Sequence, residues 1–251
     1  MYILKVVFPL VTCFIILSCN AQGNKTEYSS KSHLCTMLGS LYTVDSLVGE
    51  STLLWKKKKV QVYFMDDDGN VRDLVLKTAN AWQPHSGVQF VKCFDPSMSD
   101  IRVSFRTNGW WSYIGSDSKQ VGKDSVTLSL DSLYLYSPKV FKQVILHEFG
   151  HSLGLLHEHQ HPFLEINWNI DSLYAYYKNT YQVDSSWVKS NILKKYEDNT
   201  GIYCEPDKQS IMIYAIPPGL TTDGLIIEAP VELSILDKKY IRYMYTNKSC
   251  N

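Results

Sequence analysis

Residues 147–158 read His147-Glu148-Phe149-Gly150-His151-Ser152-Leu153-Gly154-Leu155-Leu156-His157-Glu158, and this stretch decides the fold of the chain. An α-helix repeats every 3.6 residues, so His147 and His151 lie on one face and both imidazoles can reach one metal ion. Gly154 permits a left-handed turn that ends the helix, after which the chain can present His157 as a third ligand. We therefore expect one zinc ion per chain, with a fourth position left for water as in catalytic zinc sites.

Glu148 follows the first histidine, and we expect it to lie beside the metal without binding it. There it can take a proton from metal-bound water, whose pKa zinc lowers to about 7. Gly154 and His157 at fixed offsets make the pattern far more specific than H-E-x-x-H alone. Apolar residues at 141, 144 and 145 predict that the helix before the motif packs on a sheet.

The motif resembles that of the metzincin clan of zinc peptidases, and Glu158 after the third histidine narrows the resemblance to the astacin family. Residues 210–214, Ser-Ile-Met-Ile-Tyr, are similar to the S-x-M-x-Y Met-turn of that family. The resemblance implies that Met212 forms an apolar floor under the zinc. It also implies that Tyr214 is an extra ligand that swings away to hydrogen-bond the transition state, and that Glu158 anchors the trimmed amino terminus of an activated enzyme.

The resemblance covers roughly residues 54–250, including residues 111–115, which are similar to the family's C-W-S-Y-V-G segment, and residues 166–168, which are similar to its I-N-W segment. It implies an α+β, metzincin-like two-lobed domain. A twisted mixed sheet with two helices forms the N-terminal lobe, and an irregular C-terminal lobe with a terminal helix lies across the zinc cleft. Trp111 and Gly87 stand where the family has cysteines, so the family's disulfide pattern does not carry over, and the chain resembles a divergent bacterial member.

Hydrophobic periodicity supplies the individual elements. It predicts strands at residues 60–64, 88–92, 101–105 and 125–130, and helices at 71–82 and 234–244. By resemblance to metzincins, the strand at 125–130 is expected to form the upper rim of the cleft and to pair with an extended substrate. Most aromatic residues of 163–203 are expected to fill the core of the second lobe, with one or two lining a substrate pocket.

The amino terminus reads as a targeting segment. Lys5 precedes an apolar run at residues 6–17, too short for a transmembrane helix and typical of a signal peptide. The run ends in Ile-Leu-Ser-Cys19, which resembles a bacterial lipobox with Cys19 as the lipidated residue; the alternative is an ordinary signal peptide cut nearby. We expect residues 1–18 to be the signal, 19–50 a polar tether or short pro-segment, and 51–251 the peptidase domain. The protein is then an exported cell-envelope lipoprotein or is secreted.

The net charge of the chain argues against a nucleic-acid partner. The chain has 25 basic and 25 acidic residues and no net charge, so nothing indicates nucleic-acid binding. We expect a monomer that meets a membrane only through its lipid anchor and whose partner is a protein or peptide substrate. His159 and His161 are predicted to be loop residues and not metal ligands.

Four cysteines remain after the targeting segment: Cys35, Cys93, Cys204 and Cys250. An exported chain permits disulfides, and four cysteines allow three pairings. By resemblance to astacins, Cys250 with Cys93 would be the nearest imitation of a family disulfide. A Cys35 thiolate could instead occupy the open zinc position and keep the enzyme latent, although simple pairing with another cysteine is the preferred interpretation.

These patterns predict a zinc endopeptidase that acts on extracellular or periplasmic proteins by Glu148-assisted attack of water. One alternative is a zinc hydrolase of peptidoglycan cross-link amides, which would need the same chemistry. The other is a zinc-stabilised binding module, which would have no chemical need for Glu148 or Tyr214. The natural substrate, the cleavage preference and the activation route stay open.

Overall fold

The computed structural model describes residues 35–38, 53–66, 69, 71–196 and 205–246. The chain divides into residues 1–31 and residues 32–251, and every described residue belongs to the second part. The predicted signal segment, Cys19 and most of the predicted tether thus lie outside the described residues. Within the described ranges, no helix has the length and apolar character needed to cross a membrane.

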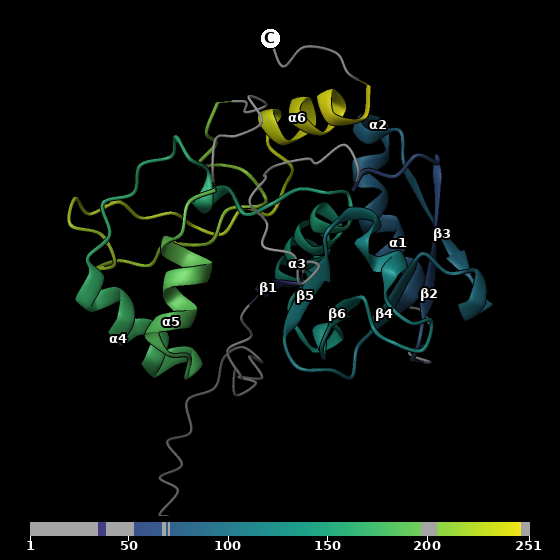
Figure 1. Cartoon of the computed structure of the whole chain (residues 1–251), viewed down its shortest axis with the longest axis horizontal. Helices are drawn as coiled ribbons and strands as arrows, with labels where there is room; N and C mark the ends of the chain where they lie inside the picture. The colour runs from purple at the N-terminus through teal and green to yellow at the C-terminus, as the bar shows by residue number, and fades with distance from the viewer. Residues whose placement is uncertain (1–34, 39–52, 67–68, 70, 197–204, 247–251) are drawn as a thin grey trace, which may run out of the picture. The chain divides into compact units, whose positions relative to one another are not determined.

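A six-stranded mixed sheet organises the first lobe (Figure 1). Its strands are β1 (Cys35–Leu38), β2 (Lys59–Phe64), β3 (Gln89–Cys93), β4 (Ile101–Ser104), β5 (Trp110–Tyr113) and β6 (Leu128–Leu130), in the order β1-β5-β6-β4-β2-β3. The pairs β2–β3, β2–β4, β4–β6 and β1–β5 are parallel, whereas β5 runs antiparallel to β6. The predicted α+β class and mixed sheet are confirmed.

The predicted strand at residues 125–130 is shorter than expected, and it lies inside the sheet and not at the rim of the cleft. The strand β6 spans only Leu128–Leu130 and lies between β4 and β5. Because both of its edges are paired, it cannot accept a substrate strand. The next strand outward is β5, and its own outer side is paired with β1 in this structure. All three residues of β6 are buried, so the strand lacks the alternation of a half-exposed rim strand.

Helices pack on this sheet and supply most of its apolar cover. The helices of the first lobe are α1 (Val71–Ala79), η1 (Asn80–Trp82), α2 (Gln83–Ser86), η2 (Pro96–Met98), η3 (Gly115–Gln120), η4 (Leu133–Leu135) and α3 (Pro138–Ser152). Ser137 caps α3 by accepting a hydrogen bond from the Val140 amide, and Pro138 starts the helix, as helix amino termini favour. The buried face of α3, including Ile145 and Phe149, joins the core cluster formed by the strands.

The second lobe has little regular sheet. It contains η5 (Glu158–Gln160), α4 (Ile170–Tyr181), α5 (Ser185–Val188) and the π-helix η6 (Lys189–Leu193). Its strand-like contacts in the described residues are the isolated bridges Trp168–Thr221 and Ile216–Ile227. A second hydrophobic cluster, with Leu173, Val188 and Ile192, fills this lobe. The predicted irregular lobe is confirmed.

The terminal helix α6 (Ile235–Thr246) follows the second lobe in sequence but packs on the first. Its buried residues Ile241 and Met244 belong to the core cluster of the sheet, and α6 contacts α2 (Figure 1). The helix therefore ties the end of the chain back to the lobe that carries α3.

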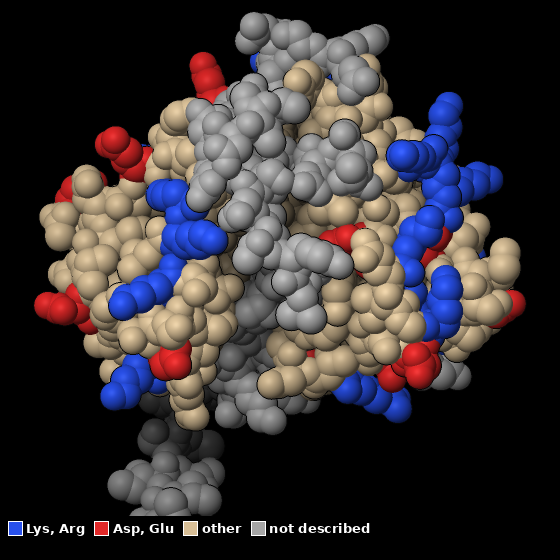
Figure 2. Space-filling model, in the orientation of Figure 1, with Lys and Arg blue, Asp and Glu red and all other residues tan. Residues whose placement is uncertain are grey.

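Cys93 is a free cysteine whose sulfur lies 3.0 Å from the Asp95 carbonyl oxygen. Cys250, its partner in the pairing that the resemblance implied, lies outside the described residues. Basic and acidic side chains occur together on both sides of the face in Figure 2, as the zero net charge predicts.

Candidate metal centre

Three histidines converge where α3 ends. His147 and His151 come from its last two turns, and His157 follows the turn after the helix. One ligand atom of each lies within 4.8 Å of the other two, and all three side chains are buried. Among the described residues, these three histidines form the group whose ligand atoms lie close enough together to hold one metal ion.

Backbone carbonyls orient two of these imidazoles. The Nδ1 atom of His147 lies 2.7 Å from the Ile211 carbonyl oxygen, and that of His151 lies 2.8 Å from the Leu155 carbonyl oxygen. Because a carbonyl oxygen only accepts, Nδ1 carries the proton in both rings and the Nε2 lone pair is available to a metal. Burial lowers the pKa of His147 to about 4 and those of His151 and His157 well below 6.5, so the imidazoles are neutral ligands.

The distances suit a single zinc ion. The Nε2 atoms of His151 and His157 are 3.1 Å apart, close to the separation of about 3.3 Å that tetrahedral zinc with bonds of about 2.0–2.1 Å requires. The buried Nε2 of His147 has no hydrogen-bond partner in the described part of the chain. A buried nitrogen without a partner is costly, and a metal ligand bond would remove that cost. The residues therefore fit the predicted zinc.

Two glycines make this geometry possible. Gly154 has φ of +100°, a conformation that L side chains rarely adopt, and it turns the chain back towards the helix end. Gly150 lies between the two helical ligands, where an added Cβ would come within 2.5 Å of the Met212 sulfur. Met212 is buried against this glycine, so the residue predicted to be the apolar floor does pack directly on the ligand-bearing helix.

Asp237 holds the Met212 turn in place. One of its oxygens accepts a hydrogen bond from the Ser210 hydroxyl (2.7 Å), and the other accepts from the Ile211 amide (2.9 Å). The same residue Ile211 supplies the carbonyl that orients His147, so Asp237 is two hydrogen bonds away from a ligand. Asp237 was not predicted from the sequence, because it lies 26 residues from Ile211 within an ordinary amphipathic helix.

Tyr214 lies against the third ligand. Its ring centroid is 4.3 Å from that of His157 and 4.4 Å from that of His159, and the His159 and Tyr214 rings are stacked at 28°. The Nε2 of His159 lies 2.8 Å from the Asn191 carbonyl oxygen. His159 is outside the metal-ligand group, as predicted, but it is fully buried in η5 and is no simple loop residue. His161, also predicted to be a loop residue, is buried beside Phe163.

The two glutamates of the motif line different cavities. Glu148 is buried beside His147 and lines a cavity of about 180 Å³, together with Trp110 of β5 and Tyr214. This cavity lies between the lobes and is the one that a substrate beside the histidines would enter.

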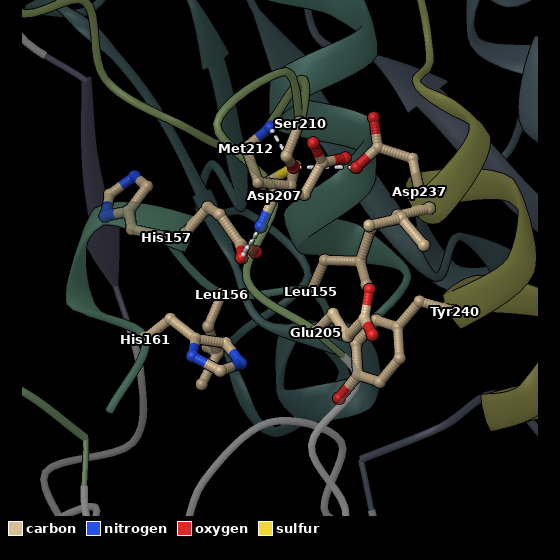
Figure 3. Close-up of a pocket in the computed structure, with 12 residues that line it drawn as sticks. Leu155, Leu156, His157, His161, Glu205, Asp207, Ser210, Met212, Asp237 and Tyr240 are labelled. Carbon is tan, nitrogen blue, oxygen red and sulfur yellow. Dashed lines mark hydrogen bonds between the residues drawn. The ribbon is translucent and has the colours of Figure 1, made fainter. Parts of the chain in front are cut away.

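Glu158 instead lines a smaller cavity of about 40 Å³ with Asp207 and Asp237 (Figure 3). Its carboxylate accepts a hydrogen bond of 2.8 Å from the Asp207 amide. Burial, with the negative charges of Asp237 and Asp207, raises the pKa of Glu158 to about 8. Glu205 also lines this second cavity, which therefore gathers four carboxyl groups, and such a group favours a cation or protons as its partner.

Known proteins resemble this chain in sequence and in fold. The family model for Astacin, which is described as a peptidase family, matches residues 48–246. The zinc metalloproteinase nas-22 of Caenorhabditis elegans is 24% identical over 208 residues, which cover 78% of this chain and 52% of that protein. The chain thus spans about half the length of the curated relatives that it matches.

Solved structures agree. The structure of myroilysin superimposes with a TM-score of 0.73 at 30% identity, covering 80% of this chain and 99% of that one. High choriolytic enzyme 1, a hatching enzyme zinc-protease from Oryzias latipes, shares the fold with a TM-score of 0.51 at 16% identity over 78% of this chain and 96% of its own.

Proposed function

This chain belongs to the astacin family of zinc peptidases, and from that premise we propose that it is an endopeptidase acting on proteins outside the cytoplasm. One observation carries the proposal: the three-histidine group, through His147, and the buried Glu148 adjoin a cavity that lies between the lobes. A structural zinc site is closed by four protein ligands, whereas three histidines leave a position for water.

His147, His151 and His157 would hold the metal. When bound, zinc would polarise the scissile carbonyl and lower the pKa of its water to about 7. Glu148 would accept the proton of the attacking water and pass it to the leaving amine as the peptide bond breaks. Glu148 is 1% exposed and lines the same cavity as His147, which would hold its carboxylate beside the reacting water.

Tyr214 would donate a hydrogen bond to the oxygen that becomes negative in the transition state. The position of its ring against His157, at the wall of the same cavity, supports this role. Such donors act by being held in place before the reaction, and the stacked His159 ring restrains Tyr214 on one side.

Residues 19–50 would serve as a pro-segment. The strand β1 pairs with β5, with Cys35 opposite Trp110, and so occupies the sheet edge next to the cleft. An extended substrate would need that edge for its own backbone hydrogen bonds. Removal of β1 would then free the edge; whether the Cys35 thiol also contacts the zinc is a separate hypothesis, and its side chain lies outside the described residues.

A new amino terminus near residue 50 would provide the cation for Glu158. The start of the described domain lies close by: Leu54 approaches Gly154, and the Trp55 amide faces the Tyr245 hydroxyl of α6. The same helix contributes Tyr240 to the Glu158 cavity. Amino-terminal sequencing of the active enzyme tests this: a start far from residue 50 would leave Glu158 with another partner.

Residues 1–18 would export the chain, and Cys19 would anchor it by lipid. The anchor rests on the sequence alone. Fatty-acid labelling of the wild type and of Cys19→Ser in a bacterial host tests it. Equal labelling of both chains, or of neither, would leave an ordinary signal peptide.

Cleavage of a mixed peptide library tests the activity itself. The chain should cut peptides, a zinc chelator should stop the cutting, and Glu148→Ala should be inactive with its zinc retained. Stoichiometric zinc without any cutting would favour an amide hydrolase of narrow specificity, such as one acting on peptidoglycan cross-links, or a binding module.

A further inference from the structure

One wall of the cavity beside Glu148 is aromatic. Tyr176, Tyr177 and Tyr181 of α4 line it, and Val144 of α3 and Ile213 add aliphatic surface to the lining. The remaining lining residues are Trp110, Gln143, His147, Glu148, Tyr214, Ala215, Pro217 and Ala229. We call this cavity the tyrosine pocket.

The tyrosines support one another as a rigid wall. The ring centroids of Tyr176 and Tyr177 are 5.4 Å apart, and those of Tyr177 and Tyr181 are 5.5 Å apart. Trp187 of α5 backs the wall, 5.8 Å from Tyr177. Burial raises the pKa of Tyr177 and of Tyr181, so both hydroxyls stay neutral. The wall therefore presents ring surface and no charge.

The charges of the pocket select against ionised substrate side chains. Among the described residues its lining contains no lysine or arginine, and its one carboxylate is Glu148. An acidic side chain would be desolvated next to Glu148, and the lining offers no lysine or arginine to pair with it. The one cation nearby would be the zinc at His147, whose open position the reacting water would take. A basic side chain would pair with Glu148 and occupy the proposed base. A neutral side chain avoids both penalties.

The size suits one ring. The pocket measures about 180 Å³, and an apolar cavity of about 150 Å³ is large enough to bind benzene. Aromatic rings also gain from edge-to-face contact with other rings, which the three tyrosines offer. We propose that the tyrosine pocket takes an aromatic side chain, phenylalanine or tyrosine, from the substrate residue next to the scissile bond.

The direction of β5 places that residue on one side of the bond. Antiparallel pairing is the more stable geometry, so a substrate strand is expected to run opposite to β5. Since β5 begins at Trp110, which lines the pocket, the substrate residues that follow the scissile bond would pass there. The aromatic residue is then the first one after the cut.

This proposal rests on the proposed endopeptidase activity, and its test separates the two. The full chain, with and without limited trypsin treatment to release the amino-terminal segment, is given four peptides that differ only after the scissile bond: phenylalanine, leucine, aspartate or lysine. We expect kcat/KM for phenylalanine to exceed that for aspartate at least about tenfold, within the range that pocket contacts achieve. Equal values, or a preference for aspartate, would overturn the pocket assignment. No chelator-sensitive cleavage of any peptide would overturn the activity and this assignment with it.

Three variants test whether the tyrosine pocket causes the preference for phenylalanine over aspartate. Tyr176→Ala should lower the phenylalanine-to-aspartate ratio about tenfold. Tyr174→Ala, on the same helix and half-buried but outside the pocket lining, should leave the ratio unchanged. Ala215→Lys places a cation at an exposed position of the lining and should raise cleavage of the aspartate peptide. If Tyr176→Ala does not fold, Ala215→Lys still decides: an unaltered preference in that variant would contradict the pocket's role.

Discussion

The two cavities beside the metal site differ in the number of acidic residues that line them, although a His-Glu pair contributes to both. Each is lined by a glutamate that directly follows a histidine ligand. Glu148 lines the tyrosine pocket, where it is the one carboxylate among the described lining residues, whereas Glu158 shares its small cavity with Glu205, Asp207 and Asp237. The difference shows that a His-Glu pair acquires its role from the groups around it. A lone acid beside an open ligand position suits proton transfer, and an acid among acids suits the binding of a cation.

The largest expected effect concerns the first glutamate. Glu148→Ala should lower kcat by about 10³ or more while zinc content stays at one per chain, because general acid–base catalysis contributes about 10²–10⁴ and the ligands are untouched. Steady-state kinetics and metal analysis measure both. Glu158→Gln is the matched control, and it should keep turnover within a few-fold of the wild type. An equal loss of kcat in the two variants would contradict the different roles assigned to Glu148 and Glu158.

Tyr214→Phe should come next, with kcat reduced about 10²-fold and KM nearly unchanged. Removing one oxyanion donor typically costs about 10²–10³, and the phenylalanine ring keeps the stacking on His159. Kinetics on a peptide with a good cleavage site would show it. A large rise in KM with intact kcat would mean that Tyr214 binds the substrate and does not stabilise the transition state.

His159→Ala should lower kcat about tenfold by releasing Tyr214, and the loss should disappear when Tyr214 is already phenylalanine. A double-mutant cycle reports this coupling, since residues in contact are not additive. His159→Phe, which keeps a flat ring against Tyr214, should restore most of the activity. His161→Ala serves as the control, because its ring neighbour is Phe163. Additive losses in the cycle would show that His159 acts without Tyr214.

The smallest effect should fall on stability. Asp237→Asn removes at least one acceptor for the Ser210 hydroxyl and the Ile211 and Ser234 amides, and it should cost about 1–3 kcal/mol of unfolding free energy. Denaturant unfolding of the zinc-loaded protein measures the change. Asp223→Asn, an exposed residue, should stay within about 0.5 kcal/mol. If the two variants are equally stable, the cavity around Glu158 does not support the turn under the metal.

The metal ligands were predictable because their relation is local. His147 and His151 are one helical turn apart and Gly154 ends the helix, so a window of twelve residues contains most of the geometry. The strands and helices with clear hydrophobic periodicity, such as β2 and α6, were found for the same reason. The strand β5 was not predicted, because it has only four residues and its exposed and buried side chains hardly alternate. All residues of β6 are buried, so it also lacks the pattern of a rim strand.

By itself the sequence determined the ligand set, because the spacing of the histidines follows the helical repeat. It indicated the α+β fold and the family through motifs that resemble those of the astacins. Only the tertiary structure decided that β5 flanks the cleft, that Glu158 turns to an acidic cavity and that Asp237 holds the Met212 turn. Those facts depend on contacts between distant segments, such as the 64 residues that separate His147 from the Ile211 carbonyl. The tyrosine pocket also depends on distant segments, because its lining comes from α4, from α3 and from the residues after Met212, and no local repeat brings these together.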